Sequence, residues 1–272
     1  MNLSNYFQCA FLLGLVFAFS ACKKEETSTP TFDPSKKGKI VLEFDQVVGD
    51  TDLKFGTNYK NAAGEEFNID FLQYYVSNIK LKSDDGREYI VPQDKSYFLI
   101  RESLAESREI TLSDIPEGNY TELSFILGVD SLRNTMDLSK RTGVLDPAGE
   151  GAGMYWMWNS GYIFFKMEGI SPAAPVGQDG LKKFRYHIGG FGGYNAKTIN
   201  NIKTITLPFP EKGTVRASVT PQAHIVVDLM KVFNGTTTLS IAKNPTVMFA
   251  PFSVDIAKNY EQMFEIHHVH ND

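Results

Sequence analysis

The stretch that decides the fold is Gly153–Gly169, which reads GMYWMWNSGYIFFKMEG. Aromatic and aliphatic residues favour strands and fill cores well, so this run predicts a central strand over Met154–Glu168 that is buried on both faces. Both tryptophans of the chain lie here. On one strand Trp156 and Trp158 project from the same face, about 7 Å apart. The alternative interpretation is a functional aromatic patch, either a sugar-stacking platform or a redox-active site, because Trp and Tyr are easily oxidised by one electron.

On both sides of this run the hydrophobic period is two, which is typical of half-buried strands. Asp85-Gly86 separates two strand-like halves and predicts a hairpin, because this pair accepts the positive φ angles of a tight turn. Short strands broken by Gly, Pro, Asn and Asp indicate an all-β fold, a single antiparallel β-sandwich domain with long loops. The other strands are expected at residues 40–45, 67–71, 74–81, 96–101, 120–129, 183–188, 202–207, 222–227 and 247–249.

Two short segments are expected to be helical, Asp228–Phe233 and Ser253–Phe264, and the second is the expected short C-terminal helix. Ser253 is a suitable N-cap residue for it. No repeat, long linker or change in composition divides residues 39–272, so this region is expected to form one domain. A chain of this size can bury a stable core without disulfides.

The N-terminal segment predicts export and lipidation. The run CAFLLGLVFAF from Cys9 to Phe19 fits the core of a secretory signal and is too short to span a bilayer. The next residues, ending at Cys22, resemble the lipobox of bacterial lipoproteins. Residues 1–21 are therefore expected to be a lipoprotein signal peptide, with a plain secretory signal as the alternative. Residues 22–38 are polar and are expected to be a flexible tether.

A lipidated Cys22 implies a place in the cell envelope. The expected location is the outer membrane, with the domain facing the periplasm or the cell surface. Lys23-Lys24-Glu25-Glu26 after the cysteine resembles the export signal of some surface-displayed lipoproteins.

Composition excludes several classes of protein. The chain has 272 residues, of which 42% are hydrophobic and 22% charged, close to the globular average and unlike a disordered polyelectrolyte or a coiled coil. The net charge of −5 and the scattered Lys and Arg argue against a nucleic-acid partner. Of the two cysteines, Cys9 is expected to be removed with the signal and Cys22 to carry lipid, so any bound metal is expected to be held without thiolate.

Catalytic templates find no support in the sequence. The run Gly189–Gly193 lacks the Lys-Ser/Thr of a P-loop, and Asn195 stands where a dinucleotide fingerprint needs its third glycine. No G-x-S-x-G or H-E-x-x-H motif occurs, and no free thiol is expected in the mature chain. We therefore expect a protein that is not itself an enzyme.

Four segments carry a resemblance to a known family. Leu145–Gly169 contains LDP followed by the tryptophan run, and it resembles the signature region of the copper-binding MbnP-like family, named for the methanobactin-associated periplasmic protein. The other segments are LQYYVSNIKL with its DDG turn (Leu72–Gly86), IPEGNYTELSFILGVD (Ile115–Asp130) and FRYHIGG (Phe184–Gly190).

The resemblance implies a β-sandwich copper binder that is periplasmic or tethered to a membrane. It also implies a di-haem cytochrome c peroxidase-like partner that oxidises a tryptophan to kynurenine, with Trp156 and Trp158 as the matching candidates. In the family this residue and histidines together form the copper site. Here the matching stretches, 75–78 and 129–135, contain no histidine, so the family's ligands do not carry over.

The chain has five histidines that could rebuild a site. Imidazole suits copper well, and copper heads the affinity order of divalent ions at a nitrogen site. In the terminal HHVH run, the second and third histidines share a face if the segment is extended, and the first and third if it is helical. The alternative interpretations are structural. The terminal run would be a solvated tail, His187 would be hydrogen-bonded at a strand end, and His224 would occupy an ordinary surface position. The metal candidates are His187, His224, His267, His268 and His270.

Two functions therefore compete at the level of sequence. The first is a copper-handling lipoprotein, which the family resemblance implies. The second is a surface lipoprotein that binds glycan or protein ligands through the aromatic patch. A purely structural role in the envelope has no feature in its favour.

Overall fold

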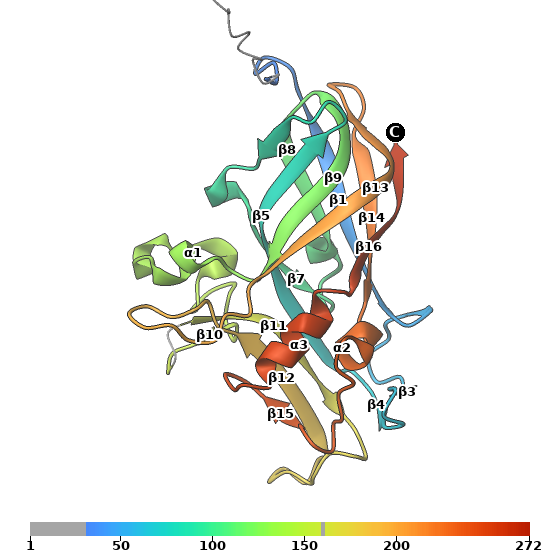
Figure 1. Cartoon of the computed structure of the whole chain (residues 1–272), viewed down its shortest axis with the longest axis vertical. Coiled ribbons are helices and arrows are strands. Elements are labelled where there is room, and N and C mark those ends of the chain that lie inside the picture. The colour runs from blue at the N-terminus through green and yellow to red at the C-terminus, as the bar shows by residue number, and fades with distance from the viewer. Residues whose placement is uncertain (1–30, 159–160) are drawn as a thin grey trace, which may run out of the picture.

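The structure is a computed structural model and describes residues 31–158 and 161–272 (Figure 1). The expected signal peptide, Cys22 and residues 23–30 of the expected tether lie outside these residues. Within the described ranges, no helix is both long enough and apolar enough to cross a membrane.

The first layer of the sandwich is a five-stranded sheet, here called the small sheet, with the order β16-β14-β1-β2 and with β8 also paired to β1. Buried and partly exposed residues alternate along β1, as expected for a strand with one face in the core. The strands are β1 (Lys37–Val48), β2 (Thr51–Asp52), β8 (Glu109–Pro116), β14 (Pro221–Asp228) and β16 (Phe264–Asn271).

The second layer is a nine-stranded sheet, here called the large sheet, with the order β13-β9-β5-β11-β12-β15. Strands β6 and β7 also pair with β5, and β10 pairs with β11. The strands are β5 (Phe71–Ser83), β6 (Glu88–Ile90), β7 (Tyr97–Arg101), β9 (Gly118–Leu127), β10 (Tyr155–Trp156), β11 (Gly161–Ile170), β12 (Lys183–Gly189), β13 (Lys203–Val215) and β15 (Thr246–Val247). A separate ribbon is formed by β3 (Tyr59–Lys60) and β4 (Glu66–Phe67).

The main core lies between the two sheets, where aromatic rings from both layers meet. Phe125 of β9 contacts Phe44 of β1 and Phe264 of β16, with ring centroids 6.0 and 5.1 Å apart. A smaller apolar cluster includes Tyr75, Tyr162 and residues of the long excursion between β9 and β11. Near β11 the large sheet is therefore covered on both faces.

Helices are short and lie at the lower part and side of the sandwich (Figure 1). They are α1 (Ser131–Thr135), α2 (Met230–Asn234) and α3 (Ser253–Tyr260), with 3-10 turns at Gln93–Lys95, Ala105–Arg108, Leu138–Lys140 and Gly143–Leu145. Both expected helices are present as α2 and α3, but their bounds differ, because Asp228 belongs to β14 and α3 ends at Tyr260 before Phe264 begins β16. The expected cap is wrong, because Phe252 holds the N-cap position and the Ser253 hydroxyl accepts a hydrogen bond from Asn201 Nδ2 at 2.9 Å. The chain also continues after α3 into β16.

The all-β sandwich is confirmed, and so is the hairpin at Asp85-Gly86, where Gly86 has φ of 84° between β5 and β6. Pairing is not wholly antiparallel, because β1 pairs with β14 and β12 with β15 in parallel. The long chain segments between these strands permit such crossovers. The packed region also begins earlier than residue 39: β1 starts at Lys37, and Phe32 stacks on Tyr120 with centroids 6.0 Å apart.

Candidate functional site

The two tryptophans belong to a hairpin, here called the tryptophan hairpin, made of β10, Met157, Trp158 and β11. The expected single strand over Met154–Glu168 is wrong, because β10 turns back and Trp156 pairs with Gly161. The side chains consequently differ in environment: Trp156 is 5% exposed and Trp158 is 65% exposed. Their rings still touch, with centroids 5.3 Å apart and planes at 39°.

Trp156 packs against Gly189, the last residue of β12 and the first of the glycine run. A Cβ placed on Gly189 would lie 2.8 Å from Trp156 Cζ3 and 2.3 Å from the Tyr162 carbonyl oxygen. Phe249 closes another side of the indole, with centroids 6.3 Å apart. Gly189 therefore has a packing role, because a side chain at this position would overlap the Trp156 indole.

Two buried tyrosines fasten the LDP segment over the outer face of the large sheet. The Tyr75 hydroxyl donates to the Val144 carbonyl and the Tyr162 hydroxyl to the Leu145 carbonyl, both at 2.7 Å. Burial raises the pKa of Tyr75 and raises the pKa of Tyr162 to about 12. These phenols stay protonated at neutral pH and act as hydrogen-bond donors.

The stretches that match the family's ligand positions are occupied by structural contacts. The Ser77 hydroxyl donates to the Gly128 carbonyl at 2.8 Å, and Asn134 Nδ2 donates to the Val129 carbonyl at 2.7 Å. Tyr75 is engaged with Val144. None of these groups is an imidazole.

His187 lies on the large sheet and is engaged by a carboxylate. Its Nε2 lies 2.7 Å from Glu168 Oε1. The hydrogen bond from His187, acting against the effect of burial, holds the pKa of Glu168 below its usual value. His187 does not belong to the metal-ligand group found among the described residues.

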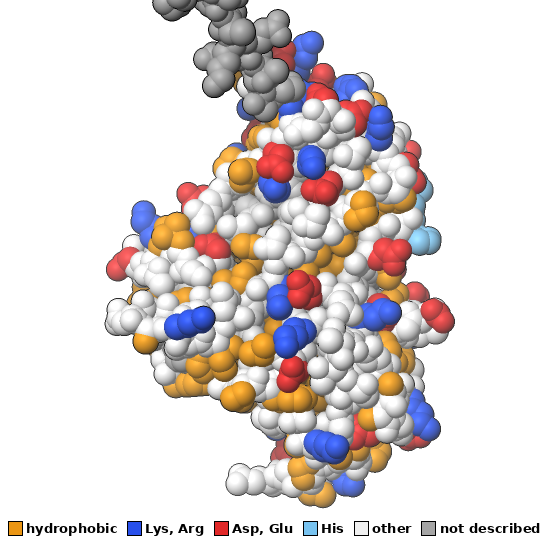
Figure 2. Space-filling view, viewed as in Figure 1, with side chains coloured by type: hydrophobic (Ala, Val, Ile, Leu, Met, Phe, Trp, Pro, Cys, Tyr) orange, Lys and Arg blue, Asp and Glu red, His pale blue; other side chains and the backbone are white. Residues whose placement is uncertain are grey.

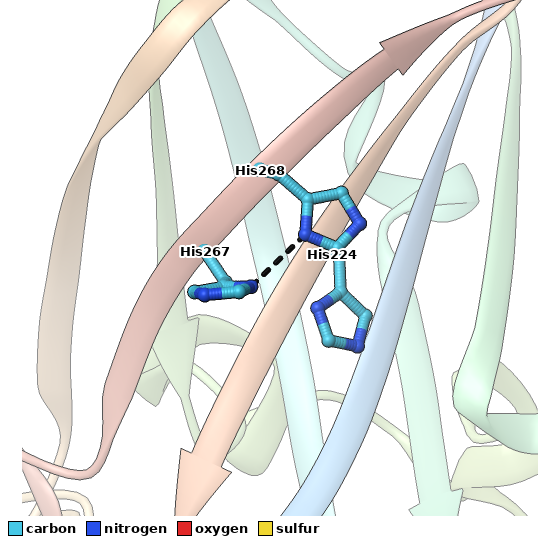
Figure 3. A group of neighbouring side chains, drawn as sticks. All are labelled: His224, His267 and His268. Carbon is cyan, nitrogen blue, oxygen red and sulfur yellow. Dashed lines mark hydrogen bonds between the residues drawn. The ribbon is translucent and has the colours of Figure 1, made fainter.

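Three other histidines converge on the outer face of the small sheet, as Figure 3 shows. They are His224 of β14 and His267 and His268 of β16, here called the histidine cluster. Their potential ligand atoms all lie within 4.8 Å of one another. The His267 and His268 Nδ1 atoms are 3.0 Å apart, and the His224 and His268 rings stack with centroids 4.7 Å apart.

A β-bulge brings the two adjacent histidines to one face. His268 lies opposite His224, whereas Ile266 lies opposite the very next residue of β14, so His267 is an extra residue in the ladder. A bulge of this kind turns consecutive side chains toward the same side of a sheet. Ile266 and Val269 are buried in the core, while His267 is exposed and His268 half-buried.

Neighbouring groups surround two members of the cluster and favour the neutral form of His268. The His224 Nε2 atom lies 3.4 Å from Asp45 Oδ2, and its Nδ1 atom is buried without a hydrogen-bond partner. Burial and the nearby imidazoles, including His270 at a centroid distance of 4.6 Å, lower the pKa of His268. A neutral imidazole is the form that binds metal ions.

All of these histidines could be picked as metal candidates from the sequence, but it did not show which of them lie together or which carboxylates lie beside them. It places His224 far from the terminal run, and Asp45 is one of many carboxylates in alternating strands. One signal was present in the sequence. Phe264 and Ile266 follow a period of two, but the next apolar residue, Val269, comes one position late, and a bulge at His267-His268 accounts for the extra residue.

The fold and these groups define a class of protein: a two-sheet β-sandwich with an aromatic hairpin on the large sheet and an imidazole cluster on the small one. The family model MbnP matches residues 37–249, and the chain belongs to the MbnP family. The structure of MbnP from Methylosinus trichosporium is similar, with a TM-score of 0.54, 17% identity, and coverage of 79% of this chain and 82% of that chain. This likeness shows the fold alone. No curated protein matches the chain significantly.

Proposed function

We propose that this protein is a copper-handling protein of the cell envelope. Membership of the MbnP family over residues 37–249 is the observation that carries the proposal. The family's association with copper and methanobactin gives the substrate class. The expected absence of thiols from the mature chain means that nitrogen and thioether groups would hold the ion.

The tryptophan hairpin alone does not fit a copper ion of the kind that the family resemblance implies. The apolar cluster that contains Trp156 offers the thioethers of Met154 and Met248 and tyrosine phenols such as that of Tyr162, and the matched ligand stretches offer no imidazole. Copper sites need several convergent nitrogen or sulfur ligands. The hairpin therefore lacks the ligand set of a copper site.

The hairpin instead supports oxidation of a tryptophan by a partner. Trp158 is exposed at the surface, where a partner protein would dock, and its ring touches buried Trp156. An electron taken from Trp156 would therefore leave the protein through the indole of Trp158. The proposed partner is a di-haem cytochrome c peroxidase-like protein. Conversion to kynurenine first cleaves the double bond of the pyrrole ring. The two oxygen atoms that enter come from hydrogen peroxide, which is reduced to water. Hydrolysis then releases one carbon atom as formate and leaves kynurenine. The haem performs this chemistry, so the chain itself is proposed not to be an enzyme.

The proposed location rests on Cys22 and the residues around it. Lipidation of this cysteine would anchor the domain to the outer membrane through the polar segment that ends near Phe32. Lipid anchoring adds membrane affinity through its acyl chains and needs no spanning helix. Membrane fractionation of the wild type and of Cys22→Ala tests the anchor, and retention of the variant in the membrane would contradict it.

The test of function uses the full chain expressed with and without a di-haem cytochrome c peroxidase-like protein. Copper stoichiometry by elemental mass spectrometry and the intact mass of the protein are measured in parallel. We expect copper to co-purify and the mass to change by conversion of one tryptophan to kynurenine. A protein that takes up no copper in either preparation and shows no oxidised tryptophan would refute the proposal.

Tryptophan variants sharpen the oxidation test. In Trp158→Phe we expect slower oxidation of Trp156, because the exposed indole that relays the electron is removed. Phe249→Leu is the matched control, since it alters packing on the other side of Trp156 and leaves the indole pair intact. Equal oxidation in both variants would argue against the relay.

A second function, binding of glycan or protein ligands, is supported by one observation. Met157 and Trp158 are 80% and 65% exposed at the tip of the hairpin, and an exposed indole is suited to stacking on a sugar or filling a pocket of a protein. Glycan-array binding that is lost in Trp158→Ala supports it. Binding that is absent, or unchanged in the variant, counts against it.

A further inference from the structure

We propose that His224, His267 and His268 bind one divalent transition-metal ion on the outer face of the small sheet, with copper(II) held most tightly among such ions. This site is separate from the tryptophan hairpin. His267 and His268 lie beyond residue 249, where the family match ends. The inference rests on the imidazoles themselves and does not require the copper-handling role proposed above.

The spacing of the nitrogens is close to that of a ligand set. Metal–nitrogen distances of about 2.0–2.1 Å place two ligands of a tetrahedral site roughly 3.3 Å apart. The Nδ1 atoms of His267 and His268 are 3.0 Å apart, and an ion that binds both would replace the proton they share. His224 lies within 4.8 Å of both, so a small rotation of its side chain completes the set.

Asp45 is the group that would orient His224. Its carboxylate lies 3.4 Å from Nε2 of the imidazole, while the buried Nδ1 has no partner. Histidine ligands usually bind the metal through one nitrogen and donate the other N–H to a carboxylate, which fixes the tautomer and raises basicity. The arrangement around His224 is that of such a ligand, with Nδ1 left for the ion.

Three carboxylates on β1, β13 and β16 also favour a cation at this position. Glu43 lies in register with His224 on β1, and Glu265 is exposed just before the bulge. Glu211 approaches from β13, where Oε1 accepts a hydrogen bond from the Val269 N–H at 2.8 Å. Negative charge near the site lowers the energy of a bound divalent ion and repels anions.

His270 stands at the rim of the site. Its ring lies 4.6 Å from that of His268 in a T-shaped contact, and the side chain is exposed on the same face. It is not a member of the group whose ligand atoms lie within 4.8 Å of one another. Replacing it should therefore weaken binding less than replacing any member of the histidine cluster.

A bound ion would join two strands of the small sheet. His224 belongs to the interior strand β14, whereas His267 and His268 belong to the edge strand β16. An ion that binds only when the strands are paired stabilises the folded state by mass action. Thermal stability should consequently rise with metal concentration in the wild type.

The experiment uses the full chain stripped of metal by a chelator and titrated separately with copper(II) and zinc(II) chloride. Calorimetry measures affinity and stoichiometry, and electron paramagnetic resonance of the copper(II) form reports nitrogen couplings from imidazole. We expect one ion per chain, coupling to imidazole nitrogens, and a higher melting temperature with either metal. Copper(II) should bind more tightly than zinc(II).

Variants locate the site. His224→Ala, His267→Ala and His268→Ala should each weaken binding by at least tenfold, and Asp45→Asn by about 10–100-fold through the lost orientation of His224. His187→Ala is the matched control, because it removes a half-buried histidine that is paired with a carboxylate elsewhere. It should leave the affinity unchanged. Circular dichroism without metal confirms that each variant is folded.

Two results would overturn the inference: no binding by the wild type, or wild-type affinity in the folded triple variant of His224, His267 and His268 to alanine. In the second case the copper-handling proposal survives, because copper is bound elsewhere. Conversely, if the histidine cluster binds zinc(II) and copper(II) in vitro but the protein isolated from cells never carries copper, the site stands and the copper-handling role fails.

Discussion

The tryptophan hairpin and the histidine cluster lie on different sheets of one sandwich and differ in how they are built. In the hairpin the oxidisable rings are held by packing. Trp156 is buried against Gly189, and the Tyr162 hydroxyl donates a hydrogen bond to the Leu145 carbonyl of the LDP segment. The histidine cluster has nitrogen ligands on an exposed sheet face, where little of the core depends on them. Figure 2 shows histidine side chains at the right edge of the molecule, opposite the side where α1 lies in Figure 1. The chain thus separates groups suited to electron transfer from groups suited to metal binding.

The largest effect is expected where the hairpin meets the glycine run. Gly189→Val would place its Cβ 2.3 Å from the Tyr162 carbonyl and its methyl groups against Trp156, so backbone or indole must move. We expect a loss of about 4 kcal/mol or more in the free energy of unfolding, measured by urea denaturation. Gly118→Val is the control, because its nearest neighbour lies at 3.5 Å. Equal losses in both variants would contradict the packing role.

The two indoles should differ in their effect on stability. Trp156→Ala empties a buried site and should cost about 3–5 kcal/mol of unfolding free energy. Trp158→Ala removes an exposed ring and should change it by less than about 0.5 kcal/mol. Chemical denaturation of both variants checks this. Similar losses would mean that Trp158 is as firmly packed as its neighbour.

Alkaline pH should loosen the hairpin before the histidine cluster. The folded-state pKa of Tyr162 is raised to about 12 by burial, above the unfolded value of about 10. Its contribution to stability is therefore complete below pH 10 and is lost as the pH rises through the folded value. Tyr162→Phe should remove this part of the pH dependence and cost about 1 kcal/mol at neutral pH through the lost hydrogen bond. The same dependence of melting temperature on pH in the wild type and in Tyr162→Phe, between about pH 10 and 12, would contradict this.

A small effect on stability, together with a large effect on metal binding, is expected from deleting His267. The shortened strand reads FEIHVHN, in which apolar residues alternate without interruption, so the core residues Ile266 and Val269 keep their places. We expect an unfolding free energy within about 1 kcal/mol of the wild type, since the bulge closes. Metal affinity should fall at least tenfold, as measured by calorimetry. Retained affinity would show that the bulge is not needed.

Much of the fold could be predicted from local patterns. Alternation along residues 40–45 and 74–81 marks strands, and Asp85-Gly86 marks a turn, because both signals depend only on neighbours in sequence. The break in the tryptophan run escaped prediction. Its aromatic content favours a strand throughout, and only the pairing of Trp156 with Gly161 shows that the chain turns back.

The sequence by itself determined the β-class of the domain, its family, the place of both tryptophans and the identity of the histidines. Tertiary structure decided which of these side chains meet. Strand periodicity is a local property that says which face a residue takes, but the partner of a strand is set by packing between distant segments. The pairing of β14 with β16 therefore brings His224 to His267 and His268, and the parallel pairing with β1 supplies Asp45.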